Sequence, residues 1–185
     1  MNKIWFVSDW HFAHNKPFIY EPRGFKTVEE MNETIIKNHN SVVDYDDDVY
    51  CLGDCMLSDN ELGLKCIKSL KGKIHIIRGN HCTDTRIELY KTCYNVVEVL
   101  EDWACVRKFN GLRFYLCHYP TMTANFDLDK PLKSRTLSLS GHTHDKGIWD
   151  AAGGYNVALD AHNNYPVEIS EIIKAFENKC NIPKS

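Results

Sequence analysis

The stretch Ile4-Trp5-Phe6-Val7-Ser8-Asp9-Trp10-His11 decides how this sequence is interpreted. Its apolar run has the length of a buried strand, and it is followed by Asp9 and His11, two residue types that bind metals. Four later apolar runs end in the same way, in Gly53-Asp54, Gly79-Asn80-His81, His118 and Gly141-His142-Thr143-His144. The chain therefore repeats one arrangement, a buried strand followed directly by polar side chains.

Segments with helical periodicity separate the first apolar runs. Residues 27–43 begin with Thr27 and Glu30, the spacing of a capping box, and residues 60–70 and 84–93 are further helix candidates. Strands that alternate with helices predict an α/β fold with a mostly parallel sheet.

The second half of the chain has a different pattern. Asn110-Gly111 separates strand candidates at 104–109 and 112–117 and predicts a β-hairpin. Residues 155–159 and 167–169 are further strand candidates, and Ser170 is placed to cap a final helix. We therefore expect antiparallel β-structure followed by a terminal helix.

Composition excludes several classes of protein. The 185 residues are 43% hydrophobic and 25% charged with a net charge of -3, which is ordinary for a globular domain and argues against an extended nucleic-acid-binding surface. No apolar run approaches the roughly 20 residues of a membrane span, and the first one is too short for a signal peptide. We expect a cytoplasmic protein without membrane contact whose eight cysteines are thiols. A structural zinc held by Cys51, Cys55 and Cys66 is the alternative role for three of them.

The strand-end residues form one candidate metal site. In open α/β sheets, ligands bind beyond the carboxyl ends of the strands, so residues far apart in sequence would meet there. The candidate donors are Asp9, His11, Asp54, Asn80, His118, His142 and His144. Seven donors exceed one tetrahedral site but suit two adjacent ions about 3.5–4 Å apart. Imidazole and oxygen donors without thiolate favour Mn first, with Fe, Zn, Co or Ni as alternatives.

Two adjacent divalent ions in such a site would determine its chemistry. They would bind a phosphate oxyanion and lower the pKa of a bridging water to give a hydroxide nucleophile. His81 would then protonate the leaving oxygen as general acid. The sequence therefore predicts a metal-dependent phosphoesterase.

In order and spacing, these motifs resemble those of the calcineurin-like metallophosphoesterases. Residues 8–15 and 156–160 are similar to the small single-domain bacterial and phage members. The resemblance covers about residues 4–169. It implies a four-layer α/β/β/α sandwich of two mixed β-sheets flanked by helices, with residues 1–185 as one domain and no separate cap domain.

The resemblance also implies individual roles. Asp9, His11 and His144 would hold one metal, while Asn80, His118 and His142 would hold the other. Asp54 would bridge the two ions, and His81 would lie beside the leaving group.

The sequence departs from the family pattern at two positions. Cys82 follows His81 where the family commonly has Asp or Glu, and Leu57 replaces a carboxylate of the phosphoprotein-phosphatase branch. Either departure removes a group that could orient His81, and Asp84 is the candidate replacement. The Leu57 departure argues against the phosphoprotein-phosphatase branch.

Candidate substrate contacts are His14, Asn15 and Arg78, which lie next to proposed ligands in the sequence. The aromatic residues Phe12, Phe18 and Tyr20 can either stack on a base or pack within their loop. Residues 121–135 have the length of a lid but also suit a solvated connector.

The predicted substrate is a small, nucleotide-like phosphomonoester or phosphodiester. One alternative is a catalytically silent protein-binding scaffold of the same fold, which the complete donor set disfavours. Another is a nuclease acting on short nucleic-acid ends, which the length and the acidic net charge disfavour. The oligomeric state is not predicted.

Overall fold

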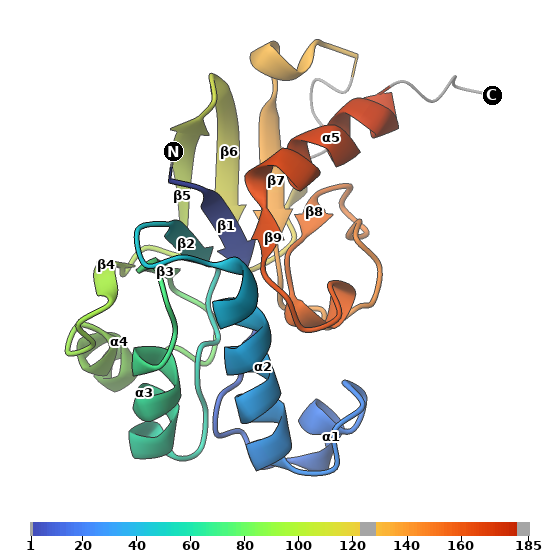
Figure 1. Ribbon diagram of the computed structural model, residues 1–185. Coiled ribbons are helices and arrows are strands. Elements are labelled where there is room, and N and C mark those ends of the chain that lie inside the picture. The colour runs from blue at the N-terminus through green and yellow to red at the C-terminus, as the bar shows by residue number, and fades with distance from the viewer. Residues whose placement is uncertain (1, 123–128, 181–185) are drawn as a thin grey trace.

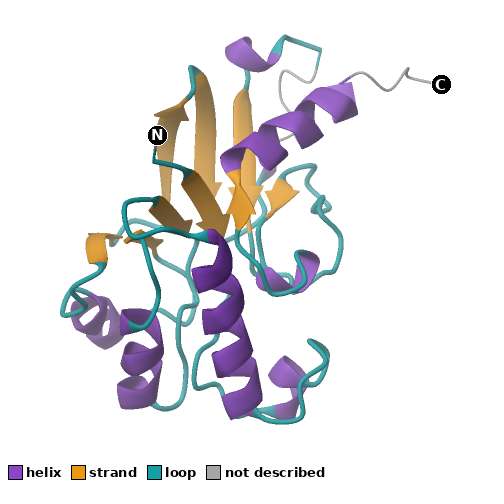
Figure 2. Ribbon diagram, in the orientation of Figure 1, coloured by secondary structure: helices purple, strands orange, loops and turns teal. Residues whose placement is uncertain are grey.

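Residues 2–122 and 129–180 are described by the computed structural model, which contains two β-sheets (Figures 1 and 2). The first sheet has the order β4-β3-β2-β1-β9, in which four strands are parallel and β9 is antiparallel. Its strands are β1 (Ile4–Val7), β2 (Asp48–Cys51), β3 (Lys73–Ile77), β4 (Val96–Leu100) and β9 (Val167–Glu168). The second sheet has the order β5-β6-β7-β8. Its strands are β5 (Ala104–Phe109), β6 (Leu112–Cys117), β7 (Thr136–Ser140) and β8 (Tyr155–Asn156).

Three helices of the first half begin at side-chain caps. Thr27, Asp59 and Thr83 each accept a hydrogen bond from a backbone N–H in the first turn of the following helix. These helices are α2 (Val28–Val42), α3 (Asn60–Lys68) and α4 (Asp84–Tyr90). The shorter helices are α1 (Pro17–Tyr20), η2 (Leu132–Ser134) and η3 (Leu159–Ala161), and α5 (Ile169–Cys180) is the last. None of the helices in the described ranges has the length and apolar character needed to cross a membrane.

Alternation along β1 divides the interior into two cores. Trp5 and Val7 belong to the core between the first sheet and α2, α3 and α4. Phe6 belongs to the core between the two sheets, which also holds Ile172 and Phe176 of α5. Two mixed sheets flanked by helices confirm the predicted α/β/β/α architecture.

Three expectations about the second half were wrong. β6 pairs with β7, and β7 with β8, in parallel, although the hairpin of β5 and β6 is antiparallel as predicted. The helix α5 begins at Ile169, so Ser170 lies in its first turn and donates to the Glu168 carboxylate instead of capping. The strand expected at 155–159 ends at Asn156, and Leu159 already belongs to η3. The sequence analysis also missed β4.

The fold brings the strand ends together. Parallel β1, β2 and β3 point in one direction, and β6 and β7 of the second sheet end at the same place, near the centre of the view in Figure 1. The loops that follow these five strands therefore meet at one edge of the sheets, next to α1.

Candidate metal centre

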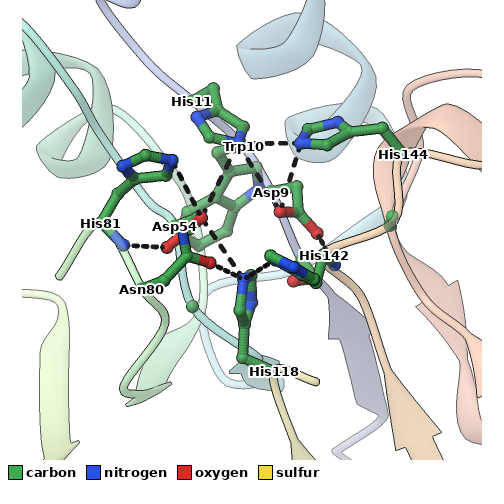
Figure 3. A network of polar contacts seen from close by, with 12 residues as sticks. Asp9, Trp10, His11, Asp54, Asn80, His81, His118, His142 and His144 are labelled. Carbon is green, nitrogen blue, oxygen red and sulfur yellow. Dashed lines mark hydrogen bonds and ion pairs between the residues drawn. The ribbon is translucent and has the colours of Figure 1, made fainter. Parts of the chain in front are cut away.

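The structure brings all seven predicted donors into one cluster, which Figure 3 shows. Asp54 lies near its middle: its Oδ2 is 3.3 Å from His118 Nε2 and 3.9 Å from His11 Nε2. On one side, His11 Nε2 lies 3.2 Å from His144 Nε2. On the other side, His118 Nε2 lies 2.8 Å from Asn80 Oδ1 and 3.2 Å from His142 Nδ1.

An unusual backbone conformation carries these side chains. Positive φ angles, which are uncommon for residues other than glycine, occur at Asp9 (61°), His11 (48°), Asp54 (54°), His142 (71°) and His144 (53°). Sharp turns directly after the strands redirect these side chains into the space that the loops share. Such conformations cost about 1–3 kcal/mol each and persist where surrounding contacts hold them.

Glycines next to the donors allow the close approach of the loops. A Cβ at Gly141 would overlap Ser8 Oγ and Asp9 Oδ2, and a Cβ at Gly79 would overlap Asp54 Oδ1. The Gly-Asn-His and Gly-His-Thr-His motifs therefore need glycine for steric reasons, because a carboxylate occupies the space beside each one.

Asp9 provides the test of whether a cation fits this site. Its Oδ2 accepts a hydrogen bond from His142 N at 2.9 Å, whereas its buried Oδ1 has no hydrogen-bond partner. That oxygen lies 3.6 Å from His11 Nε2 and 3.7 Å from His144 Nε2. An unpartnered buried carboxylate oxygen among imidazole nitrogens is unfavourable without a positive charge, so the residues fit a metal ion.

Two groups in the described part of the chain place metal-binding atoms within 4.8 Å of one another: Asp9 with His11 and His144, and Asp9 with Asp54 and His118. Neither group contains a cysteine. Cys51 and Cys55 have their Sγ atoms 3.6 Å apart in the first core, and the seven described cysteines are free. The structure therefore gives no support to the zinc site considered for Cys51, Cys55 and Cys66.

The shifted pKa values of Asp9 and His118 indicate that the cluster favours bound positive charge. Burial would raise the pKa of Asp9, but the nearby imidazoles of His11, His118 and His144 outweigh burial and hold that pKa well below its usual value. Burial would lower the pKa of His118, but Asp54 and Asp9 raise it to about 9. The carboxylates are therefore ionised at neutral pH and attract a proton or a cation.

His81 lies at the mouth of the cluster. Its side chain is 41% exposed, and its Nε2 lies 4.0 Å from Asp54 Oδ2. Its backbone is fixed, since its N–H donates to Asp54 Oδ1 and its carbonyl accepts from Arg86. The candidate for orienting its ring, Asp84, pairs with Arg78 at 2.6 Å instead, and Cys82, which stands in place of the family's carboxylate, is buried with its Sγ 4.0 Å from Tyr90 Oη.

A cavity of about 620 Å³ opens above the cluster. Its polar lining residues are His11, His14, Asp54, Asn80, His81, His142, His144 and Asp160. Its apolar lining residues are Phe18, Ile19, Pro22 and Leu57. No lysine or arginine is among these described lining residues.

The predicted substrate contacts differ in their placement. His14 lines the cavity and its Nδ1 is 3.3 Å from His11 Nδ1. Asn15 is exposed outside the lining, and Arg78 stacks on Trp103, with its Cζ 5.2 Å from the ring centroid. Phe12 is fully buried, whereas Phe18 is 68% exposed beside His14. Of the candidate lid at 121–135, residues 123–128 lie outside the described part of the chain.

Sequence analysis missed two residues behind the cluster. Asp160 Oδ2 lies 3.0 Å from His144 Nδ1, and Arg23 makes a bidentate ion pair with Asp160. Asp160 belongs to a segment that the family resemblance singled out, but Arg23 lies more than a hundred residues away and only the fold reveals the pair.

Known proteins are similar to this chain in sequence and in fold. A family model described as the calcineurin-like phosphoesterase superfamily domain matches residues 2–157. The uncharacterized protein MJ1445 of Methanocaldococcus jannaschii is 34% identical over 187 residues, covering 96% of this chain and 93% of that protein. The Gene 66 protein of Mycobacterium phage L5 is 35% identical over 85 residues, 44% of this chain and 40% of that protein.

Two solved structures share the fold. A protein of unknown function from Aquifex aeolicus, AQ665, aligns with a TM-score of 0.71 at 24% identity, covering 95% of this chain and all of that one. A structure described as a novel archaeal phosphodiesterase aligns with a TM-score of 0.50 at 17% identity, covering 90% of this chain and 98% of that one. At these identities the likeness shows the fold alone.

Proposed function

Since the chain belongs to the calcineurin-like phosphoesterase superfamily, we propose that it hydrolyses a small phosphate ester with the help of two divalent metal ions. The observation that carries this proposal is the convergence on Asp54, where imidazoles from the loops after β1 and β6 lie within 4 Å of one carboxylate oxygen. Family membership supports phosphoesterase activity, and the cluster supports metal dependence.

The donors divide between the two ions as the family pattern suggests. Asp9, His11 and His144 would hold one ion, Asn80, His118 and His142 the other, and Asp54 would bridge them. Mn is the first candidate, and Fe, Zn, Co and Ni suit the same donors. When bound, such ions neutralise the charge of a phosphate group and supply hydroxide at neutral pH.

His81 is the candidate general acid. Its partly exposed ring stands at the edge of the cavity, 4.0 Å from the proposed bridging carboxylate, where it can donate a proton to a leaving oxygen. Its fixed backbone keeps the ring at this place, because Asp54 Oδ1 accepts from its N–H. His14, whose pKa burial lowers to about 4, is neutral in the same cavity and suits contact with an uncharged part of the substrate.

The cavity favours a substrate with one phosphate and an uncharged ring. The described lining offers no lysine or arginine to pair with a second phosphate. Its apolar lining includes Phe18, which is exposed and lies edge-to-face against His14 with ring centroids 5.7 Å apart. A nucleoside or aryl group can stack there while its phosphate lies over the cluster, which supports a nucleotide-like monoester or diester.

Hydrolysis of p-nitrophenyl phosphate and bis(p-nitrophenyl) phosphate tests the proposal. We expect turnover of at least one ester with added Mn²⁺, loss of turnover with a chelator, and a fall of about 10²–10³-fold for Asp54→Asn, as for the loss of one electrostatic group in an active site. Asp47→Asn is the matched control, because Asp47 is also a buried carboxylate but directly precedes β2 and accepts hydrogen bonds from Lys3 N and Trp5 Nε1. Equal activity of the wild type and Asp54→Asn would contradict the proposal.

A further inference from the structure

We propose that Asp160 and Arg23 are positioning residues that hold His144 for one of the two metal ions and leave the other ion's site unaffected. This inference rests on the metal centre proposed above. Neither residue belongs to the donor set, and both act through the imidazole ring of His144.

The His144 ring is held from both sides. On the side of the cluster, its Nε2 lies 3.2 Å from His11 Nε2 and 3.7 Å from Asp9 Oδ1. On the opposite side, its Nδ1 lies 3.0 Å from Asp160 Oδ2. Because a carboxylate only accepts hydrogen bonds, Nδ1 carries the proton and the Nε2 lone pair faces the cluster.

Arg23 fixes the carboxylate in turn. Its Nε and Nη2 donate to the two oxygens of Asp160 at 3.1 and 2.8 Å. The same guanidinium donates to the backbone carbonyls of Asp9 at 2.8 Å and Trp10 at 3.3 Å. Its side chain is only 1% exposed. These acceptors hold the planar guanidinium in one orientation. Arg23 therefore connects η3, which carries Asp160, to the turn that carries Asp9 and His11.

The two proposed ion sites differ in how their histidines are oriented. His118 donates from Nδ1 to a backbone carbonyl, Leu52 O, at 2.7 Å. His144 donates to an ionised carboxylate, which makes its imidazole a more basic ligand. The contacts of Asp160 and Arg23 reach the side of the cluster with Asp9, His11 and His144, so their loss should affect that side alone.

Calorimetric titration of the metal-free full chain with Mn²⁺ tests this proposal without relying on turnover. We expect two binding events in the wild type. Asp160→Ala should weaken one of them by about 10–100-fold, the usual effect of removing a group that orients a metal-binding histidine, and change the other by less than about threefold. Asp160→Asn keeps an acceptor without the charge and should weaken the same event less.

A double-mutant cycle separates positioning from general loss of structure. Because Asp160 acts through His144, adding Asp160→Ala to His144→Gln should weaken Mn²⁺ binding no further than His144→Gln alone. The matched control, Asp47→Asn, should keep both events unchanged. Electron paramagnetic resonance should show the coupled signal of two ions in the wild type and a single-ion signal in Asp160→Ala at limiting Mn²⁺.

Three results would overturn the proposal. Asp160→Ala could leave both events unchanged, weaken both equally, or add its effect to that of His144→Gln. In each case, two binding events in the wild type would leave the proposed metal centre intact. A wild-type protein that binds no Mn²⁺ would overturn this inference together with the metal-dependent function.

Discussion

The donor cluster and the apolar rim of the cavity, which consists of Phe18, Ile19, Pro22 and Leu57, line the same cavity but differ in how they are held. In the cluster, Asp9 and His118 are buried and hydrogen-bonded, and Asp9 lies in a turn with a positive φ angle. On the rim, Phe18 belongs to the four-residue helix α1 and is 68% exposed. From this difference we expect the cluster to determine the reaction and the rim to select which esters are hydrolysed.

The largest expected effect comes from filling the space beside the cluster. Gly141→Ala places a methyl group against Ser8 and the Asp9 carboxylate. We expect Mn²⁺-dependent turnover to fall by at least about 100-fold, because a misplacement of about 1 Å in an active site has that consequence. Gly147→Ala is the control, since a Cβ at Gly147 meets its nearest neighbour at 3.7 Å. Equal turnover of the two variants would show that the close packing beside Asp9 is unimportant.

A smaller effect is expected on the rim. Phe18→Ala removes the exposed ring and should raise KM for an aryl or nucleoside ester by about 5–100-fold, the range for loss of one aromatic stacking partner. The value of kcat should change little, because Phe18 does not contact the cluster. Tyr94→Ala, which removes an exposed ring that does not line the cavity, is the control. An unchanged KM in Phe18→Ala would remove the rim from the account of specificity.

The smallest effect concerns a histidine outside the cluster. His39 donates from Nε2 to Lys71 O in the first core, and burial lowers its pKa to about 4. The folded protein keeps His39 neutral down to about pH 4, whereas in the unfolded chain His39 takes up a proton below about pH 6.5. Its contribution to the free energy of unfolding is therefore complete above pH 6.5 and is lost as the pH falls towards 4. The free energy of unfolding should therefore fall by about 1–3 kcal/mol more in the wild type than in His39→Gln between pH 7 and pH 4.5. Parallel pH profiles of the two proteins, measured by urea unfolding, would contradict this role of burial.

The sequence predicts the cluster better than it predicts the surroundings of the cluster. Asp9, Asp54 and His118 each follow a buried strand directly, so strand order alone brings them to one edge of the fold. Arg23 and Asp160 follow no such pattern, because an ion pair between distant loops depends on how those loops fold. Arg78 shows the same limit: its place beside Gly79 suggested a substrate contact, yet it stacks on Trp103 and pairs with Asp84.

The pairing of the strands was also only partly predictable. Asn110-Gly111 determines a local hairpin, and both residues have the positive φ that such a turn needs. The parallel pairing of β6 with β7 depends on a connection whose residues 123–128 lie outside the described chain, and no local signal encodes it. Local turns were therefore predicted correctly, whereas long connections were not.

The number of Mn²⁺ ions bound per chain is the most direct test of the central claim that five strand ends form one metal centre. Metal analysis combined with electron paramagnetic resonance of the wild type should give two ions per chain with a spin-coupled signal. Binding of only one ion, or of two ions without coupling, would contradict the claim that Asp54 bridges a pair.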